Sequence, residues 1–339
     1  MIDPLRLLMS RQLKHFKLAQ KTSGFTLIEL LVAMIMAFLI IGPLMGFMIN
    51  TLNTDRQEQA KATSEQEIQS ALDFIAQDLD QAVYIYDADG LNNKSTDNPP
   101  GIKDQILPVA TSTNSNCVNN SSNTCVPILA FWKREFNQGI LPASTTSNCT
   151  SNSSNCNDTF VYSLVVYYFI QGNNANGTWS NAARIGRFEI RDGVVDPNNP
   201  TNTNGTPKYI QNPSPGFKLF DLTLSGQALK DKMDSWLRDS SQNYTDYPFI
   251  LVDYIDQNLL DSGTQASLKA NCPAPQLVTA NFVAGFYACV NSSKTSAQLY
   301  IRGNALARIQ NANTYNSSQS IYFPTASIQI KGRGFLSTN

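Results

Sequence analysis

The sequence is poor in the residue type that carries much of enzyme chemistry, because its 339 residues include a single histidine, His15. Everything after residue 15 therefore lacks a Ser-His or Cys-His nucleophile pair and a histidine metal ligand. A pair of carboxylates can still hydrolyse a glycosidic bond without histidine, and Asp253 and Asp256 are candidates for such a pair. Acids usually lie in solvent, so we favour the interpretation that both are exposed loop residues.

Charge is scarce as well. Charged residues make up 15% of the chain, the formal net charge is −1, and no clustered basic excess is present after the first residues. Nucleic-acid binding is therefore not expected. The only strongly basic stretch precedes Gly24, where one acid, Asp3, is outnumbered by Arg6, Arg11, Lys14, Lys17 and Lys21. The positive-inside rule places this stretch in the cytoplasm and the residues after about 50 on the other side of the membrane.

One long apolar run follows the basic stretch, from Phe25 to Ile49. It is long enough for a membrane-spanning helix, which needs about 20 apolar residues. Its one acid, Glu29, would cost roughly 2.5 to 3.5 kcal/mol at the centre of such a helix, so we expect it to have a partner or a function. The alternative is a plain anchor whose Glu29 reaches the headgroups. Gly42 and Pro43 predict a kink or a locally melted turn, because proline lacks a backbone donor.

Residues 24 to 31 read GFTLIELL and join the basic stretch to the apolar run. This segment resembles the type III signal of type IV pilins and type II secretion pseudopilins. The resemblance implies that a prepilin peptidase removes residues 1–24 as a leader and methylates the new amino terminus of Phe25. A secretory signal peptide has the opposite order, with its small cleavage residue after the apolar core. The mature protein would then contain no histidine.

The same resemblance implies that Glu29 is an assembly residue. It lies about one helical turn from the amine that cleavage frees, and it can neutralise the amine of a neighbouring subunit in a packed bundle. The implied partners are the prepilin peptidase, other pilins or pseudopilins, an inner-membrane assembly platform and, before assembly, membrane lipid. The implied location is the inner membrane with the head in the periplasm, and then a fibre at the cell surface. No cofactor is expected.

Further segments resemble the cyanobacterial hormogonium polysaccharide secretion pseudopilins, close to minor pilin W and pseudopilin J. They are Gln66 to Asp87, Leu129 to Lys133, and Phe323 to Gly334. This weaker resemblance implies a minor subunit that initiates a motility fibre or lies at its tip. It also implies a coupled role in polysaccharide export, with polysaccharide as a candidate partner.

The expected fold is α+β, with a long pilin-like N-terminal helix packed on an antiparallel β-sheet head whose loops are stapled by disulfides. Apolar residues recur at spacings of three and four as far as Tyr86, which predicts a helix from Asn53 to Tyr86 with one apolar face. We therefore expect a membrane and assembly helix at 25–52, an amphipathic stalk helix at 53–90 and a head at 91–339, with a linker at 92–101.

The head is expected to be mostly β-structure. The predicted strands are Val126 to Lys133, Phe160 to Ile170, Ala183 to Arg191, Gln276 to Val290, Gln298 to Arg302 and Ile321 to Lys331. Phe160 to Asp192 is predicted to be a hairpin with its tip at Gly172 to Gly177. A short helix is predicted from Ser225 to Arg238, with Met233 and Trp236 on its apolar face.

The six cysteines are Cys117, Cys125, Cys149, Cys156, Cys272 and Cys289. An even number outside the cytoplasm indicates disulfides. The simplest connectivity joins each cysteine to its nearest neighbour, and an alternative cross-links the first four between two loops. A zinc site is disfavoured, because the sequence has no Cys-x-x-Cys spacing and no histidine after residue 15.

Two weaker patterns remain. Asp87 and Asp89 precede Gly90 as in some calcium loops, but the match is poor and a polar turn that ends the helix is the favoured interpretation. Four aromatic residues could form a sugar-stacking surface, although strand aromatics usually belong to the core. They are Trp132, Tyr167, Tyr168 and Trp179.

Three classes of function are therefore open: a structural, non-enzymatic fibre subunit, a membrane-anchored glycan-binding head and an anchored carboxylate hydrolase. The signal segment and the apolar run favour the first class.

Overall fold

The structure is a computed structural model that describes residues 24–108, 117, 123–144, 149, 156–172, 178–224, 228–310, 314–334 and 336. Most of the expected leader, residues 1–23, lies outside the described residues, as do most of the expected hairpin tip and the start of the helix predicted at Ser225. The chain divides into two compact units, Met1–Asp55 and Arg56–Asn339.

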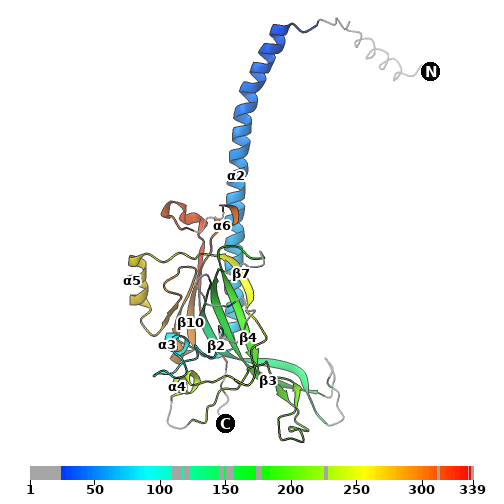
Figure 1. The fold of residues 1–339 in the computed structure, drawn as a ribbon, viewed down its shortest axis with the longest axis vertical. Helices are drawn as coiled ribbons and strands as arrows, with labels where there is room; N and C mark the ends of the chain where they lie inside the picture. The colour runs from blue at the N-terminus through cyan, green and yellow to red at the C-terminus, as the bar shows by residue number, and fades with distance from the viewer. Residues whose placement is uncertain are drawn as a thin grey trace, which may run out of the picture. The chain divides into compact units, whose positions relative to one another are not determined.

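The longest element is helix α2, Leu27–Asp80, which runs through both units (Figure 1). Its apolar part in the first unit is, by length and composition, able to cross a membrane. The helix continues through Gly42 and Pro43 without a break, and the kink expected there stays a prediction.

The second part of α2 confirms the predicted apolar face. Its buried residues follow the spacing of three and four and are Ala60, Ser64, Ile68, Ala71, Leu72, Ile75 and Leu79. The helix ends at Asp80, however, and not at Tyr86. Residues Ala82–Ile85 form strand β1, which pairs antiparallel with β2 and is buried throughout. A strand that is covered on both faces is apolar at successive positions. The apolar residues of β1 therefore also fit the helical spacing of α2, which is why the predicted helix extended too far.

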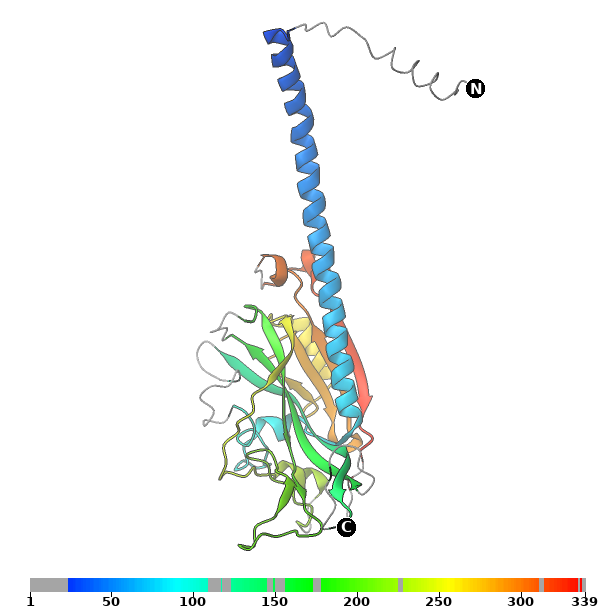
Figure 2. The same ribbon diagram turned by 90° about the vertical axis from the view of Figure 1, so that its right-hand side faces the viewer.

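The larger sheet has five strands in the order β1-β2-β3-β4-β7, and each neighbouring pair is antiparallel. Its further strands are β2 Thr124–Pro142, β3 Cys156–Gln171, β4 Ala183–Arg191 and β7 Phe249–Ile255. The pairing of β3 with β4 confirms the predicted hairpin. Figure 2 shows the end of α2 running alongside the strands of the head.

The smaller sheet has four strands in the order β11-β10-β9-β8. They are β8 Leu277–Thr279, β9 Phe286–Asn291, β10 Ser296–Arg302 and β11 Thr325–Lys331. The single strand predicted from Gln276 to Val290 is wrong, because Asn281 and Phe282 adopt φ of 52° and 59° and interrupt it. Such left-handed residues cannot continue a strand.

Short elements complete the head. They are α3 Ala88–Asn92, β5 Val194–Val195, β6 Tyr209–Gln211, α4 Leu229–Asp234, α5 Ser262–Asn271, η1 Ser292–Lys294, α6 Ala307–Gln310 and η2 Ser317–Tyr322. The helix predicted from Ser225 to Arg238 is thus much shorter, although Met233 and Trp236 are buried as expected. The strand predicted from Ile321 begins at Thr325, because η2 occupies the preceding residues.

Residues 92–101 are not a linker. They lead directly into Ile102 and Ile106, whose side chains are fully buried. At Gly101 an added Cβ would lie 2.6 Å from the backbone oxygen of Asn93, so the chain packs too closely there for any larger residue. The segment is therefore an integral part of the head.

Aromatic side chains form the centre of the head. The ring of Trp132 makes edge contacts with Phe217, Phe220 and Trp236. Trp132, Tyr167 and Tyr168 are fully buried, and Trp179 packs partly buried against the core. The core interpretation of these strand aromatics is therefore confirmed.

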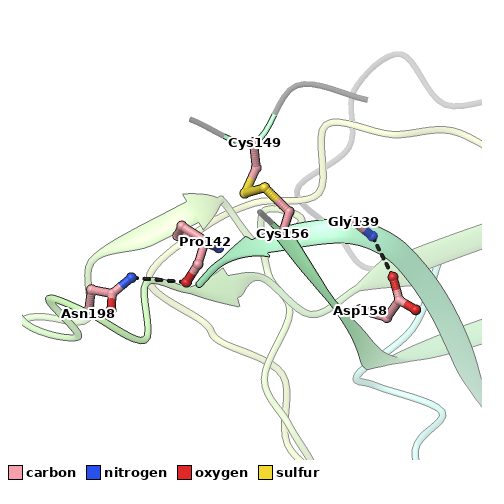
Figure 3. Close-up of a disulfide and its surroundings, with 6 residues drawn as sticks. All are labelled: Gly139, Pro142, Cys149, Cys156, Asp158 and Asn198. Atoms are coloured by element: carbon pink, nitrogen blue, oxygen red, sulfur yellow. Dashed lines mark hydrogen bonds between the residues drawn. A yellow bond between two sulfur atoms is a disulfide. The ribbon is translucent and has the colours of Figure 1, made fainter. Parts of the chain in front are cut away.

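Three disulfides join each cysteine to its nearest neighbour in sequence: Cys117–Cys125, Cys149–Cys156 and Cys272–Cys289. Figure 3 shows the second of these at the far end of the β2–β3 pair, where Gly139 N donates to Asp158 at 2.7 Å and Asn198 Nδ2 donates to the Pro142 oxygen at 3.0 Å. The fold is α+β and pilin-like, as predicted, with a long N-terminal helix, antiparallel sheets and disulfide-stapled loops.

Candidate assembly site

The candidate assembly site lies at the start of α2. Thr26 precedes the helix, and its backbone oxygen accepts hydrogen bonds from the amides of Glu29 at 3.0 Å and Leu30 at 3.1 Å. Threonine suits this place because its hydroxyl can also accept from a first-turn amide, here that of Glu29 at 3.4 Å. Gly24 and Phe25 lie outside the helix, so the peptide bond between them is not held in regular structure.

Glu29 lies in the first turn of α2, where the partial positive charge of the helix N-terminus favours a carboxylate. Within the described residues no ion pair is recorded for this carboxylate, and the residue is exposed.

The apolar residues around this site are exposed throughout residues 25–52. Phe25 is 79% exposed and Leu27 is 85% exposed, and the most apolar stretch of the helix contains no buried residue. A helix that is apolar on all sides needs lipid or neighbouring helices around it. This part of the chain is suited to insertion in a membrane and to packing in a helical bundle.

A charged cluster fastens the other end of α2 to the five-stranded sheet. Asp78 of α2 accepts from Arg187 Nε of β4 at 2.6 Å and from the Tyr167 hydroxyl of β3 at 2.6 Å. Lys133 of β2 lies 3.1 Å from Asp78 and 3.1 Å from Glu189. Burial opposes ionisation of Asp78, but the hydrogen bond from Arg187 and the charges of Lys133 and Arg187 outweigh it and lower the pKa. The cluster is a structural joint between helix and sheet.

Sequence reasoning missed this cluster, because its members are separated by as many as 109 positions. The available signal was Lys133, which directly follows the apolar run Ile128 to Trp132 in the predicted strand. A lysine that is 4% exposed requires paired acids.

A second cluster surrounds the calcium candidate. Asp87 caps α3 by accepting from Gly90 N at 3.2 Å, and Lys230 Nζ lies 2.6 Å from the same oxygen. Asp87 therefore begins a helix, which corrects the expectation that it ends one. Asp89 lies in the first turn of the same short helix. In the part of the chain that the structure describes, no group of three or more His, Cys, Asp or Glu residues is placed to hold a metal ion.

The two carboxylates considered for hydrolysis are held by structural donors. Asp256 is fully buried and pairs with Arg302 at 2.5 Å, so the expectation of an exposed loop acid is wrong for this residue. Asp253 lies in β7 and accepts from Ser180 N at 2.8 Å and from Ser180 Oγ at 2.7 Å. A buried acid paired with arginine is not placed to exchange a proton with a substrate.

Comparison with known protein families matches the start of the chain. The prokaryotic N-terminal methylation motif matches residues 20–45, which include Gly24, Phe25 and Glu29. No curated protein and no solved structure matches the chain. The motif supports the type IV pilin and pseudopilin family for this chain, with processing by a prepilin peptidase and assembly with other pilins. Together with the apolar start of α2, it indicates that the protein is anchored in a membrane.

Proposed function

We propose that this protein is a non-enzymatic minor pilin or pseudopilin subunit that enters a type IV pilus-like or type II secretion-like fibre through residues 25–52. One observation carries the proposal. The methylation motif matches residues 20–45 and so overlaps the first part of α2, residues 27–49, which is apolar and exposed on all sides and has Glu29 as its one acid. Such a surface is stable only when lipid or other helices cover it.

The proposed topology follows from the charges. The basic residues before Gly24 stay in the cytoplasm, α2 crosses the inner membrane, and the head folds in the periplasm. Disulfide formation in the head fits that oxidising compartment. After cleavage at Gly24 and methylation of Phe25, the subunit leaves the lipid for the fibre with the help of an assembly platform.

The minor role is proposed because the head is large and rich in loops, which suits a subunit present in few copies. A role in motility, coupled to polysaccharide export, rests on the weaker sequence resemblance of the head. The glycan-binding alternative is less favoured, because three of the four aromatic residues considered for it are buried in the core. The hydrolase alternative is less favoured, because Asp256 is buried and a substrate cannot reach it.

The proposal is tested by replacing Glu29 with glutamine in the full chain, in cells that assemble the fibre. Insertion in the membrane should be normal, because losing a charge does not hinder it. Entry into fibres should fall at least tenfold, because an unpaired amine buried in the bundle costs roughly 3 to 5 kcal/mol. Glu58→Gln is the matched control, since Glu58 is an exposed glutamate on the same helix. Immunoblots of sheared fibres and membranes give the readout. Wild-type entry of Glu29→Gln into fibres would refute the assembly role.

A further inference from the structure

A groove of about 940 Å³ lies in the head between α2 and β7. One wall is a single stripe of α2 with the spacing of three and four residues that defines one helix face. The residues of this wall are Thr63, Gln66, Glu67, Ser70, Ala71 and Phe74. Most of these side chains are short or polar. The exception is Phe74, a large apolar side chain that is 42% exposed.

The opposite wall is formed by consecutive residues of β7, from Ile250 to Tyr254, and Thr178, Trp179 and Ser180 complete the lining beside Asp253. Side chains of a strand alternate between the two faces of a sheet, so a groove over one face would be lined by every second residue. A run of consecutive residues is the lining expected of a groove that follows the edge of the strand. β7 is indeed the last strand of its sheet, with β4 on its other side. An edge strand presents backbone N–H and C=O groups that can pair with another strand.

The two walls are similar in length. Thr63 to Phe74 extends about 16 Å along the helix axis, at 1.5 Å per residue. Ile250 to Tyr254 extends about 14 Å along β7, at 3.4 Å per residue. The groove is therefore as long as a strand of about five residues, which is the usual length of a strand in a sheet.

One end of the groove is closed by Tyr254. Its φ of 58° interrupts the extended backbone one residue before β7 ends at Ile255, and its backbone oxygen accepts from Asn304 N at 2.7 Å. Arg308 of α6 stacks on the Tyr254 ring at 4.1 Å and pairs with Glu67 of α2. Arg308 thus links the strand wall to the helix wall, and Figures 1 and 2 both show α6 beside α2. A bulky residue held at positive φ is a strained conformation of the kind found at binding sites.

We propose that this groove binds an extended peptide segment of another fibre subunit, which joins the five-stranded sheet as an additional strand beside β7. The inference rests on the proposed function, because assembly is what brings another subunit to the head. The edge determines the kind of occupant. A helix has no free backbone groups to offer a strand edge, whereas an extended peptide pairs with it along its whole length.

The side chains of the groove suggest what the segment would contain. Side chains on one face of the added strand would meet Phe74 and Leu251, and both offer apolar contact. Glu67 and Arg308 form an ion pair at the Tyr254 end of the groove, so neither side chain offers an unpaired charge to a ligand. The groove therefore favours an uncharged segment with small or apolar residues at alternate positions.

Backbone hydrogen exchange tests the proposal on the full chain, both in sheared fibres and in detergent-solubilised subunits. Exchange of the β7 segment should slow at least tenfold in fibres, since strand pairing protects amides. The edge strand β11 of the smaller sheet is the internal control and should not change. Ser70→Trp fills the groove from its helix wall and should abolish the protection of β7. Gln69→Trp is the matched variant, because Gln69 is exposed on α2 but does not line the groove.

A photoreactive benzophenone amino acid at position 70 identifies the occupant. Fibres should yield a cross-link to a peptide of another subunit, and mass spectrometry should place it in an extended segment outside that subunit's N-terminal helix. Equal exchange of β7 in fibres and detergent, protection that survives Ser70→Trp, or a cross-link to polysaccharide or to an N-terminal helix would each overturn the inference. If the wild-type subunit were absent from fibres, the proposed function itself would fail and this inference with it.

Discussion

Arg187 on strand β4 donates a hydrogen bond of 2.6 Å from Nε to Asp78, near the end of α2. The same carboxylate accepts from Tyr167 on β3 and pairs with Lys133 on β2. One acid therefore connects the helix to three neighbouring strands. Because these charges are largely removed from water, their partners must all be present for the joint to be stable.

Asp78→Asn should destabilise the protein by roughly 1.5 to 3 kcal/mol, because it weakens the charge-assisted hydrogen bonds that this carboxylate accepts, while Lys133 and Arg187 keep Glu135 and Glu189 as partners. Urea unfolding of the full chain in detergent, followed by tryptophan fluorescence, measures this loss. Asp73→Asn is the control, since Asp73 is exposed on the same helix and its carboxylate accepts a hydrogen bond from Gln69 on the helix surface. A similar loss in both variants would mean that the charged cluster does not hold the helix.

The pH dependence of this joint has a definite sign. The pKa of Asp78 is lowered in the fold, so its contribution to stability is fully present above the unfolded value of about 3.9 and is lost as the pH falls through the lower folded value. Wild-type stability should therefore drop below pH 4 more steeply than that of Asp78→Asn. Urea midpoints measured between pH 2.5 and 5 provide the comparison.

Asp234 should act in the opposite direction. Burial raises its pKa to about 6, against the pull of Lys230 at 2.9 Å, and the charge of Asp87 adds to the increase. The protonated form is thus favoured in the fold, so the contribution of Asp234 to stability is largest below about pH 4 and declines as the pH rises to 6. At pH 7 the ionised form costs roughly 3 kcal/mol, at 1.36 kcal/mol per unit.

Asp234→Asn should remove this decline between pH 4 and 7, because asparagine does not titrate. Tyr84, which donates to Asp234 at 3.2 Å, keeps an acceptor in the variant. Asp231→Asn, on the exposed side of α4, serves as the control and should keep the wild-type pH profile. If stability of Asp234→Asn fell with pH as the wild type does, another group would be responsible.

The disulfide between Cys272 and Cys289 ties the end of α5 to β9. Replacing both cysteines with serine should cost about 3 kcal/mol, the loop-closure value for a loop of this length. Alkylation of the unreduced, unfolded wild-type chain should label no cysteine, and labelling of two or more would contradict the pairing. Unfolding of the double variant under the same oxidising conditions measures the energetic loss.

The sequence predicted the elements whose pattern is local. Ile68, Leu72, Ile75 and Leu79 mark the buried face of α2 at helical spacing, and all are buried. The β3–β4 hairpin was found because its strands are close in the chain. Strand β7 was missed although Phe249–Ile255 is rich in β-forming residues, a signal that was available.

Other features depend on contacts that no local pattern contains. β1 continues the apolar spacing of α2, and only its pairing with Phe131 and Trp132 of β2 makes it a strand. The same holds for the joint at Asp78 and for the groove beside β7, whose walls come from distant parts of the chain. The residues proposed for processing and assembly are the opposite case, since Gly24, Phe25 and Glu29 belong to one short segment that the methylation motif matches.

Processing gives the last prediction. Mature protein from membranes should begin at Phe25 and carry an N-methyl group, because a cut after Gly24 frees an amine beside the turn that contains Glu29. Gly24→Trp should leave an uncut precursor that inserts in the membrane but does not enter fibres. The described structure places no atom within 4 Å of a Cβ added at Gly24, so a failure of this variant would reflect recognition by the peptidase and not a damaged fold.

Gly46→Ala provides the control, because Gly46 also has open space around it but lies within the helix, away from the cut. This variant should be cleaved and assembled like the wild type. Amino-terminal sequencing and intact-mass measurement of membrane and fibre fractions distinguish the forms. Intact Met1 in assembled wild-type protein would contradict the cut at Gly24. It would also remove the amine that Glu29 is proposed to neutralise, so the apolar part of α2 would then serve as an anchor alone.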